Sequence, residues 1–306
     1  MDILVPALLT IITAATPLLY AALGELVVEK SGVLNLGIEG MILLGAVCGF
    51  AAVHFSGSEA LAIVAGLAGG AALASVFALL TLGLQASQVA TGLALTIFGI
   101  GLSALLGRDL VGVAYAGLPK LPIPLLAEIP FLGELLFRHD ALVYGSVAMV
   151  AAVMWFLSRS RAGLVLRAVG DSPDAAHAIG YPVLRIRFCA VLFGGAMAGL
   201  AGAYLSLAYS PLWIENMSSG RGWIALALVV FATWRPARVL VGAYLFGGIT
   251  ILQLHAQALG VGVPSQVMSM LPYLATIAVL VLISRDRTKI KLNAPASIGR
   301  PFHPTA

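Results

Sequence analysis

The sequence contains few charged residues. Only 10% of its 306 residues are Asp, Glu, Lys or Arg, whereas a soluble domain carries roughly 25%. Hydrophobic residues make up 60% of the chain, and the mean hydropathy is +1.03. Because so few charges cannot cover a surface that faces water, the composition excludes an ordinary soluble domain. Lipid is the expected solvent for most of the chain.

Cysteine is also scarce, and lysine occurs at four positions only. Cys48 and Cys189 lie far apart in apolar runs, so we expect small buried side chains and neither a disulfide nor a metal framework. No lysine follows a glycine; the four are Lys30, Lys120, Lys289 and Lys291. A phosphate-binding loop of the form G-x-x-x-x-G-K-[ST] is therefore excluded within this sequence, and we expect the chain itself to bind no cofactor.

Catalytic motifs are missing as well. The sequence contains neither H-E-x-x-H nor G-x-S-x-G, and its five histidines are scattered from His54 to His303. The net charge of +4 does not indicate nucleic acid, because the basic residues gather at the ends of apolar segments. Five lie between Arg159 and Arg187 and five more between Arg285 and Arg300. This placement is typical of cytoplasmic segments of membrane proteins.

Apolar segments recur along the whole chain at lengths that suit membrane spans. We expect an all-α, polytopic transmembrane helix bundle with about nine spans, within a range of eight to ten. The bundle would form one domain over residues 1–284, with a cytoplasmic loop at 159–187 and a cytoplasmic tail at 285–306. The candidate spans are 3–23, 33–54, 60–83, 88–107, 141–158, 188–209, 222–234, 239–257 and 267–284.

Two properties of these segments refine the expectation. Segment 222–234 is short for a regular span, which favours a broken or re-entrant helix. Abundant Gly and Ala inside the segments favour close helix packing. The basic clusters place the C-terminus in the cytoplasm, and counting back from it places the 108–140 loop and the N-terminus outside.

The loop between the fifth and sixth candidate spans contains the signals of a short helix. Ser172 is suited to the N-cap, Pro173 to the first helical position, and Asp174 to the positive end of the helix dipole. Gly180, followed by Pro182, ends the pattern. So short a helix needs something to pack against. Either it rests on its own bundle, or it docks in a groove of a cytoplasmic partner.

A second polar stretch lies at or just inside a membrane boundary. Asn35 and Glu39 are four residues apart, so a continuous helix would place them on one face, whereas the glycines at 32, 37 and 40 would allow a break. A carboxylate at this depth suggests a transport path. The alternative is a structural Glu that ties spans together through Ser, Arg or backbone groups. Arg221 is its candidate ionic partner.

Four stretches together resemble one family. They are Gly163 to Gly180, Glu29-Lys-Ser-Gly-Val-Leu-Asn-Leu-Gly-Ile-Glu-Gly-Met41, Gly220-Arg-Gly-Trp-Ile-Ala-Leu-Ala-Leu-Val-Val-Phe231 and Ala294-Pro-Ala-Ser-Ile-Gly-Arg-Pro301. They resemble the permeases of ATP-binding-cassette importers of the sugar and nucleoside branch, and most of all a bacterial nucleoside importer permease.

The resemblance carries implications for the fold, the partners and the site. It implies a type II-like importer permease in the bacterial inner membrane, a separate ATPase that binds ATP, a second homologous permease and an extracellular substrate-binding lipoprotein. It also implies that the loop helix couples to the ATPase. The coupling residues would be Gly170, Asp171, Ser172, Pro173, Asp174, Ala175, Ala176 and Gly180, and the path residues Asn35, Glu39 and Arg221.

Two other functions compete with a nucleoside importer permease. A sugar is the alternative substrate within the same class. An ion-coupled secondary transporter or channel would act without an ATPase and would carry charges deep in several spans, but this sequence has almost none there. A membrane enzyme, such as a lipid-modifying protein, has no motif to support it.

Overall fold

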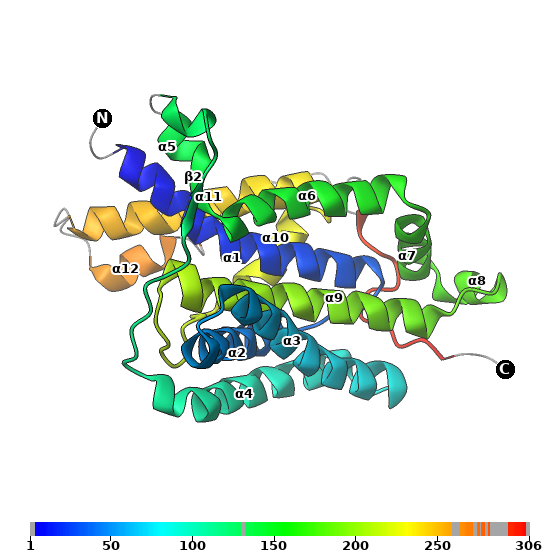
Figure 1. Cartoon of the computed structure of the whole chain (residues 1–306). Coiled ribbons are helices and arrows are strands. Elements are labelled where there is room, and N and C mark those ends of the chain that lie inside the picture. Colours follow the sequence, from blue (N-terminus) through cyan, green and yellow to red (C-terminus); the bar gives the residue numbers. More distant parts are fainter. Residues whose placement is uncertain are drawn as a thin grey trace.

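Long apolar helices run side by side along one direction (Figure 1). A computed structural model describes residues 4–129, 132–258, 264–271, 274–275, 277–278, 281 and 293–303. Within these residues, seven helices are long and apolar enough to cross a membrane. They are α1 (Leu4–Lys30), α2 (Ile38–Ser56), α3 (Glu59–Ala78), α4 (Gln88–Gly107), α6 (Ala141–Arg159), α9 (Val183–Tyr204) and α11 (Pro236–Ala258).

These seven helices correspond to seven of the nine predicted spans. The short segment predicted at 222–234 is α10 (Arg221–Phe231), a helix of 11 residues. Most of the predicted span at 267–284 lies outside the described residues, and the preceding α12 is Ser265–Ser269. The described helices therefore establish a polytopic helical bundle, whereas the count of nine spans stays a prediction.

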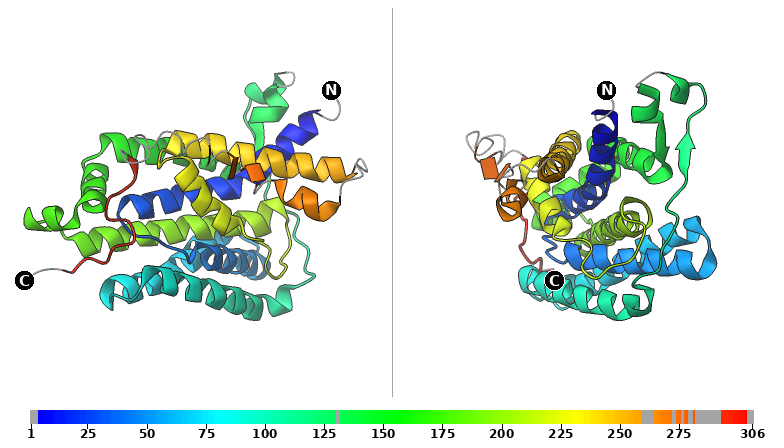
Figure 2. Two further views of the ribbon diagram at one scale, coloured as in Figure 1. Left: turned by 180° about the vertical axis from the view of Figure 1, so that it is seen from behind. Right: turned by 90° about the vertical axis from the view of Figure 1, so that its left-hand side faces the viewer.

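The bundle has two distinct ends (Figures 1 and 2). At one end, which we call the α5 end, lie the start of α1, α12 and the segment with α5 (Leu132–Phe137). In this segment β1 (Lys120–Pro122) pairs antiparallel with β2 (Arg138–Asp140). At the opposite end, the α8 end, lie α7 (Arg161–Asp171) and α8 (Pro173–Ala178). The N-terminus of α1 and the loop between α6 and α9 thus lie at opposite ends.

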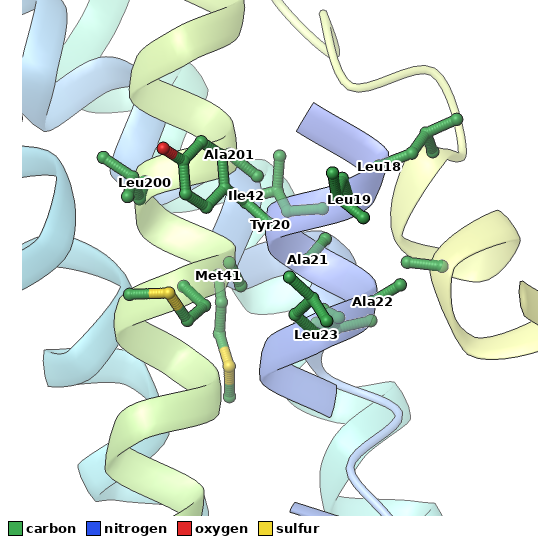
Figure 3. Packing of buried hydrophobic residues seen from close by; sticks show 14 of the residues in the cluster. Leu18, Leu19, Tyr20, Ala21, Ala22, Leu23, Met41, Ile42, Leu200 and Ala201 are labelled. Atoms are coloured by element: carbon green, nitrogen blue, oxygen red, sulfur yellow. The ribbon is translucent and has the colours of Figure 1, made fainter. Parts of the chain in front are cut away.

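The core forms where α1, α2 and α9 pack together (Figure 3). Small residues allow the backbones to approach closely, as predicted from composition. A Cβ atom on Gly45 of α2 would lie 2.3 Å from the Cα of Gly199 in α9, and one on Gly70 of α3 would lie 2.1 Å from the carbonyl oxygen of Gly195. Any larger side chain would separate α9 from its neighbours.

Three local features differ from the sequence expectations. Residues 161–171, expected as loop, form the amphipathic helix α7, whose Leu166 and Val169 are buried while Leu164 is exposed. The span expected to start at residue 33 starts later, because residues 31–37 are non-helical, as the glycines allowed, and α2 begins only at Ile38. Cys48 is half-buried, but Cys189, expected to be buried, is exposed on the apolar surface of α9.

Candidate coupling helix and translocation path

The short helix predicted in the α6–α9 loop is present as α8. The Ser172 hydroxyl accepts a hydrogen bond from the Ala175 N–H at 3.4 Å, and Pro173 occupies the first turn. Gly180 has φ +92°, and its N–H donates to the carbonyl of His177. The local signals in the sequence therefore set both ends of this helix.

One face of α8 rests on the bundle and the tail. Ala176 is buried with Val169, Val183 and Phe302, and the rings of His177 and Phe302 lie 5.5 Å apart. This small apolar cluster supplies the packing that so short a helix requires. It also ties the tail to the loop, a contact that the sequence alone did not indicate.

The other face of α8 is exposed at the α8 end. Ile179 is 73% exposed and Tyr181 39% exposed, so apolar surface adjoins the helix. Of the eight predicted coupling residues, Gly170 and Ala176 are buried and Pro173 is half-buried. The exposed ones are Asp171, Ser172, Asp174, Ala175 and Gly180. The helix thus rests on its own bundle with one face and leaves the other face exposed.

Residues 31–37 form a non-helical connector between α1 and α2. Asn35 lies in this connector, so it does not share a helix face with Glu39 as a continuous helix would require. The Asn35 side-chain oxygen accepts from the Gly37 N–H at 2.9 Å, and its amide nitrogen lies 3.3 Å from the sulfur of Met41. Asn35 therefore shapes the break that the glycines permit.

Glu39 lies in the first turn of α2 and binds the first turn of α10. Its carboxylate accepts hydrogen bonds from the Ser218 hydroxyl at 2.5 Å, the Gly220 N–H at 2.7 Å and the Gly222 N–H at 2.5 Å. Glu39 is only 3% exposed. The carboxylate satisfies N–H groups that the helix leaves without partners and complements the positive end of its dipole.

Arg221 lies beside this contact but points elsewhere. Its Nη1 donates to the carbonyls of Met217 at 3.3 Å and Ser218 at 3.1 Å, and its guanidinium lies 5.1 Å from the centre of the Tyr209 ring. The contacts of Glu39 therefore come from Ser218 and from backbone N–H groups instead of the expected ion pair with Arg221. The structure brings Glu39 and Arg221 close together and leaves Asn35 on the preceding connector.

After a π-helical turn at Leu205–Tyr209, the chain before α10 is unwound and carries exposed polar side chains. Leu212 bridges to Ala114, near the α5 end, whereas the Gly222 N–H meets Glu39 deep in the bundle. Asn216 and Ser219, between these points, are exposed and have positive φ angles of 54° and 49°. The sequence interpretation missed both, although the polar run before Gly220 was a signal.

Two further carboxylates in α1 were missed because the apolar segment expected at 3–23 ends before them, whereas the helix continues to Lys30. Glu29 accepts from the Trp234 indole N–H at 2.5 Å, and Glu25 accepts from the Asn35 N–H at 3.2 Å. Both side chains are 1% exposed. Trp234 follows α10, so this contact fixes the C-terminal end of α10 to the last turn of α1. Among the described residues, no cluster of His, Cys, Asp and Glu could hold a metal ion.

The helix starts of α2 and α10 thus meet inside the bundle. From this meeting point α2 runs toward the α5 end, where Glu59 after its end lies 3.5 Å from the Tyr115 hydroxyl. In contrast α10 runs toward the last turn of α1 at the α8 end. Interrupted helices whose N-terminal ends lie inside the bundle are typical of transporters, and α10, with 11 residues, is such a short helix.

Comparison with known proteins shows the family of the chain. A family model described as branched-chain amino acid transport system / permease component matches residues 7–280. The chain belongs to this family. It is a membrane-spanning permease component, and not an enzyme.

Three curated relatives are ABC transporter permease proteins. The chain is 43% identical to a putative glucose ABC transporter permease protein of Haloferax volcanii, over 95% of both chains. It is 32% identical to a guanosine ABC transporter permease protein of Bacillus subtilis, over 99% of this chain and 97% of the relative. It is also 32% identical to a nucleoside ABC transporter permease protein of Lactococcus lactis, over 88% and 89%.

Proposed function

We propose that the chain is the permease subunit of an ATP-binding-cassette importer that moves a nucleoside into the cytoplasm. The observation that carries the proposal is α8, which is capped and packed on one face and exposed on the other. Its exposed apolar surface suits a groove on a partner. Because the sequence has no phosphate-binding loop, ATP would be bound by that partner, a separate ATPase subunit.

The direction of transport follows from the orientation of the bundle. The α8 end carries the basic cluster of 159–187, and the tail packs against the same end through Phe302 and His177. Basic residues favour the cytoplasmic side. The ATPase and the C-terminus would then lie in the cytoplasm, while the α5 end would receive solute from an extracellular binding lipoprotein. The membrane would be the bacterial inner membrane.

The unwound segment before α10 supports a path along this chain. Non-helical backbone at membrane depth is tolerated only where protein covers it or where it lines a water-filled cavity. The exposed Asn216 and Ser219 side chains are suited to the second situation. A second, homologous permease facing this segment would close the path, with Arg221 beside it and Glu39 supporting it from behind.

Two substrate classes are supported by specific observations. Two relatives that act on guanosine or nucleosides each match most of this chain, and on this basis we propose a nucleoside. The relative with 43% identity is a putative glucose permease, which favours a sugar as the second candidate. Competition for uptake into vesicles by guanosine and by glucose would separate these two classes.

The test of the coupling role is a bulky residue on the exposed face of α8. We expect A175W in the intact transporter to abolish ATP-driven uptake while the permease is still inserted, because Ala175 is exposed and contributes nothing to the buried cluster. The control is A60W, which places the same residue on an exposed alanine at the opposite end of the bundle. Unimpaired uptake by A175W would contradict the proposal.

Purification in mild detergent tests the same function by another route. We expect an ATPase subunit to copurify with the tagged wild-type chain in a fixed ratio, and A175W to lose it. An ion-coupled secondary transporter predicts instead a chain that purifies alone and supports uptake driven by an ion gradient.

A further inference from the structure

A fully buried arginine lies where the loop, the tail and the broken helix meet. Arg187, in the first turns of α9, is 0% exposed. Its Nε donates to the carbonyl of Ser31 at 3.1 Å, its Nη1 to the carbonyl of Arg300 at 3.2 Å, and its Nη2 to the hydroxyl of Ser297 at 3.0 Å. These acceptors belong to the connector before α2 and to the tail, which are far apart in sequence.

All three acceptors of Arg187 are neutral. Burying a charged group is costly unless it is hydrogen-bonded, and removal of its partners leaves that cost uncompensated. The guanidinium fork presents several donors in fixed directions, so it holds its acceptors at one relative position. Arg187 therefore fixes the position of the connector relative to the tail.

Ser297 extends the contact to the end of α7. Its hydroxyl donates to the carbonyl of Gly170 at 2.6 Å, and its N–H donates to the same carbonyl at 3.0 Å. Gly170 directly precedes Asp171 and the N-cap of α8. The tail thus connects Arg187 to the base of the exposed helix.

The connector packs directly on this cluster without intervening side chains. A Cβ on Gly170 would lie 2.1 Å from the Lys30 carbonyl oxygen, and one on Gly32 would lie 2.4 Å from the Ser297 hydroxyl. Gly32 has φ +89°, and its carbonyl accepts from the Gly299 N–H at 3.1 Å. Close backbone contact means that a displacement of Gly170 must displace the connector.

The connector continues to the centre of the bundle. Three residues after Gly32 it reaches Asn35, and after Ile38 it reaches Glu39, which binds the N-terminal turn of α10. A continuous series of contacts therefore joins the surface of α8 to the point where the two broken helices meet.

We propose that Arg187 and Ser297, neither of which is among the predicted coupling residues, are positioning residues for coupling. They would transmit displacement of α8 through the connector to the start of α2 and hence to α10. The tail would therefore take part in coupling through Ser297 and the carbonyl of Arg300. The proposal rests on the proposed function, because it assumes that an ATPase moves α8.

The experiment uses the complete transporter, with its ATPase and binding protein, in sealed vesicles. S297A removes one hydroxyl and keeps the backbone contact with Gly170, and R187K keeps the positive charge but loses the fork. The controls are S160A, which removes the N-cap hydroxyl of α7 that accepts from the Gly163 N–H, and R300A, since this exposed residue contacts Arg187 and Ser297 through its backbone carbonyl and N–H. ATP hydrolysis and solute uptake are measured on the same vesicles.

We expect the solute moved per ATP hydrolysed to fall at least about fivefold in S297A and further in R187K, as expected when a coupling free energy is lost. Both controls should keep the wild-type ratio. If the solute moved per ATP hydrolysed is unchanged in S297A, including the case in which hydrolysis and uptake fall in parallel, Ser297 is only structural and the inference is overturned. If R187K does not assemble, S297A decides alone. Failure of the wild type to show ATP-driven uptake would refute the proposed function instead.

Discussion

At the scale of single residues, Glu39 shows how a carboxylate can lie inside an apolar bundle. It accepts three hydrogen bonds, two of them from the N–H groups of the N-cap Gly220 and of Gly222 in the first turn of α10. Hydrogen bonds to charged groups contribute about 1.5–3 kcal/mol each, and unpaired buried groups are costly. Glu39 is therefore a structural link between α2 and α10.

We predict that E39Q lowers the thermal stability of the purified chain. A glutamine has one acceptor oxygen and an NH2 group that would face the N–H groups of α10, so about 2 kcal/mol or more of stability should be lost. The measurement is thermal unfolding in detergent. The matched control is E128Q, because Glu128 is exposed in the loop before α5. An unfolding temperature equal to that of the wild type would show that the Glu39 contacts contribute nothing.

Residue-level prediction from the sequence succeeded where the determinants are local. Ser172, Pro173 and Gly180 define α8 through contacts within a few residues, and these could be predicted from helix-end chemistry. The partners of Glu39 could not, since Ser218 is 179 positions away. The sequence left open whether Asn35 and Glu39 share one face of a continuous helix or are separated by a break, and the helix begins only after Gly37, where Asn35 hydrogen-bonds the backbone.

At the scale of elements, glycine decides how closely the helices approach. A Cβ on Gly199 of α9 would lie 2.2 Å from the carbonyl oxygen of Gly66 in α3. Among the described residues, no atom lies within 4 Å of a Cβ placed on Gly101 of α4. Both glycines lie inside long helices. Substitution of each by alanine therefore separates the cost of a steric clash, expected only at Gly199, from the effect on helix propensity, expected at both.

We predict that G199A destabilises the chain and G101A does not. The added methyl group in G199A should cost about 1–3 kcal/mol through overpacking. In G101A the same group should contribute about 0.5–1 kcal/mol of stability, because alanine favours a helix over glycine. Thermal unfolding in detergent measures both, and equal effects of the two substitutions would contradict the packing role of Gly199.

Helix existence and helix position were predictable to different degrees. Apolar runs of suitable length located seven long helices, because length and hydropathy are properties of each segment alone. The break before α2 was indicated by glycines, but α7 was missed. Its helix is amphipathic and lies between basic residues, so it gives no signal of a span. The association of Ser297 with Gly170 depends on long-range contacts that no local pattern contains.

At the scale of the whole molecule, the chain has two features expected of one subunit of a transporter complex. It offers an exposed helix at the α8 end and an unwound polar segment facing outward before α10. Non-helical backbone in a membrane must be covered by protein or line a water-filled cavity, and the exposed Ile179 and Tyr181 beside α8 are apolar surface of the kind that protein contacts cover. The division between a membrane domain at 1–284 and a tail stays a prediction, since residues 282–292 lie outside the described part. Which end faces the cytoplasm decides whether the ATPase can reach α8.

Single cysteines would settle this orientation. After replacement of Cys48 and Cys189 by alanine, A175C places a thiol on the exposed face of α8, and S56C places one at the end of α2 near the opposite end of the bundle. We predict that a membrane-impermeant maleimide modifies S56C only in right-side-out vesicles and A175C only in inverted vesicles, because the basic loop favours the cytoplasm. Each variant is the control for the other. Modification of A175C in right-side-out vesicles would place α8 outside, where no cytoplasmic ATPase could bind it, and would overturn both the coupling role and the import direction.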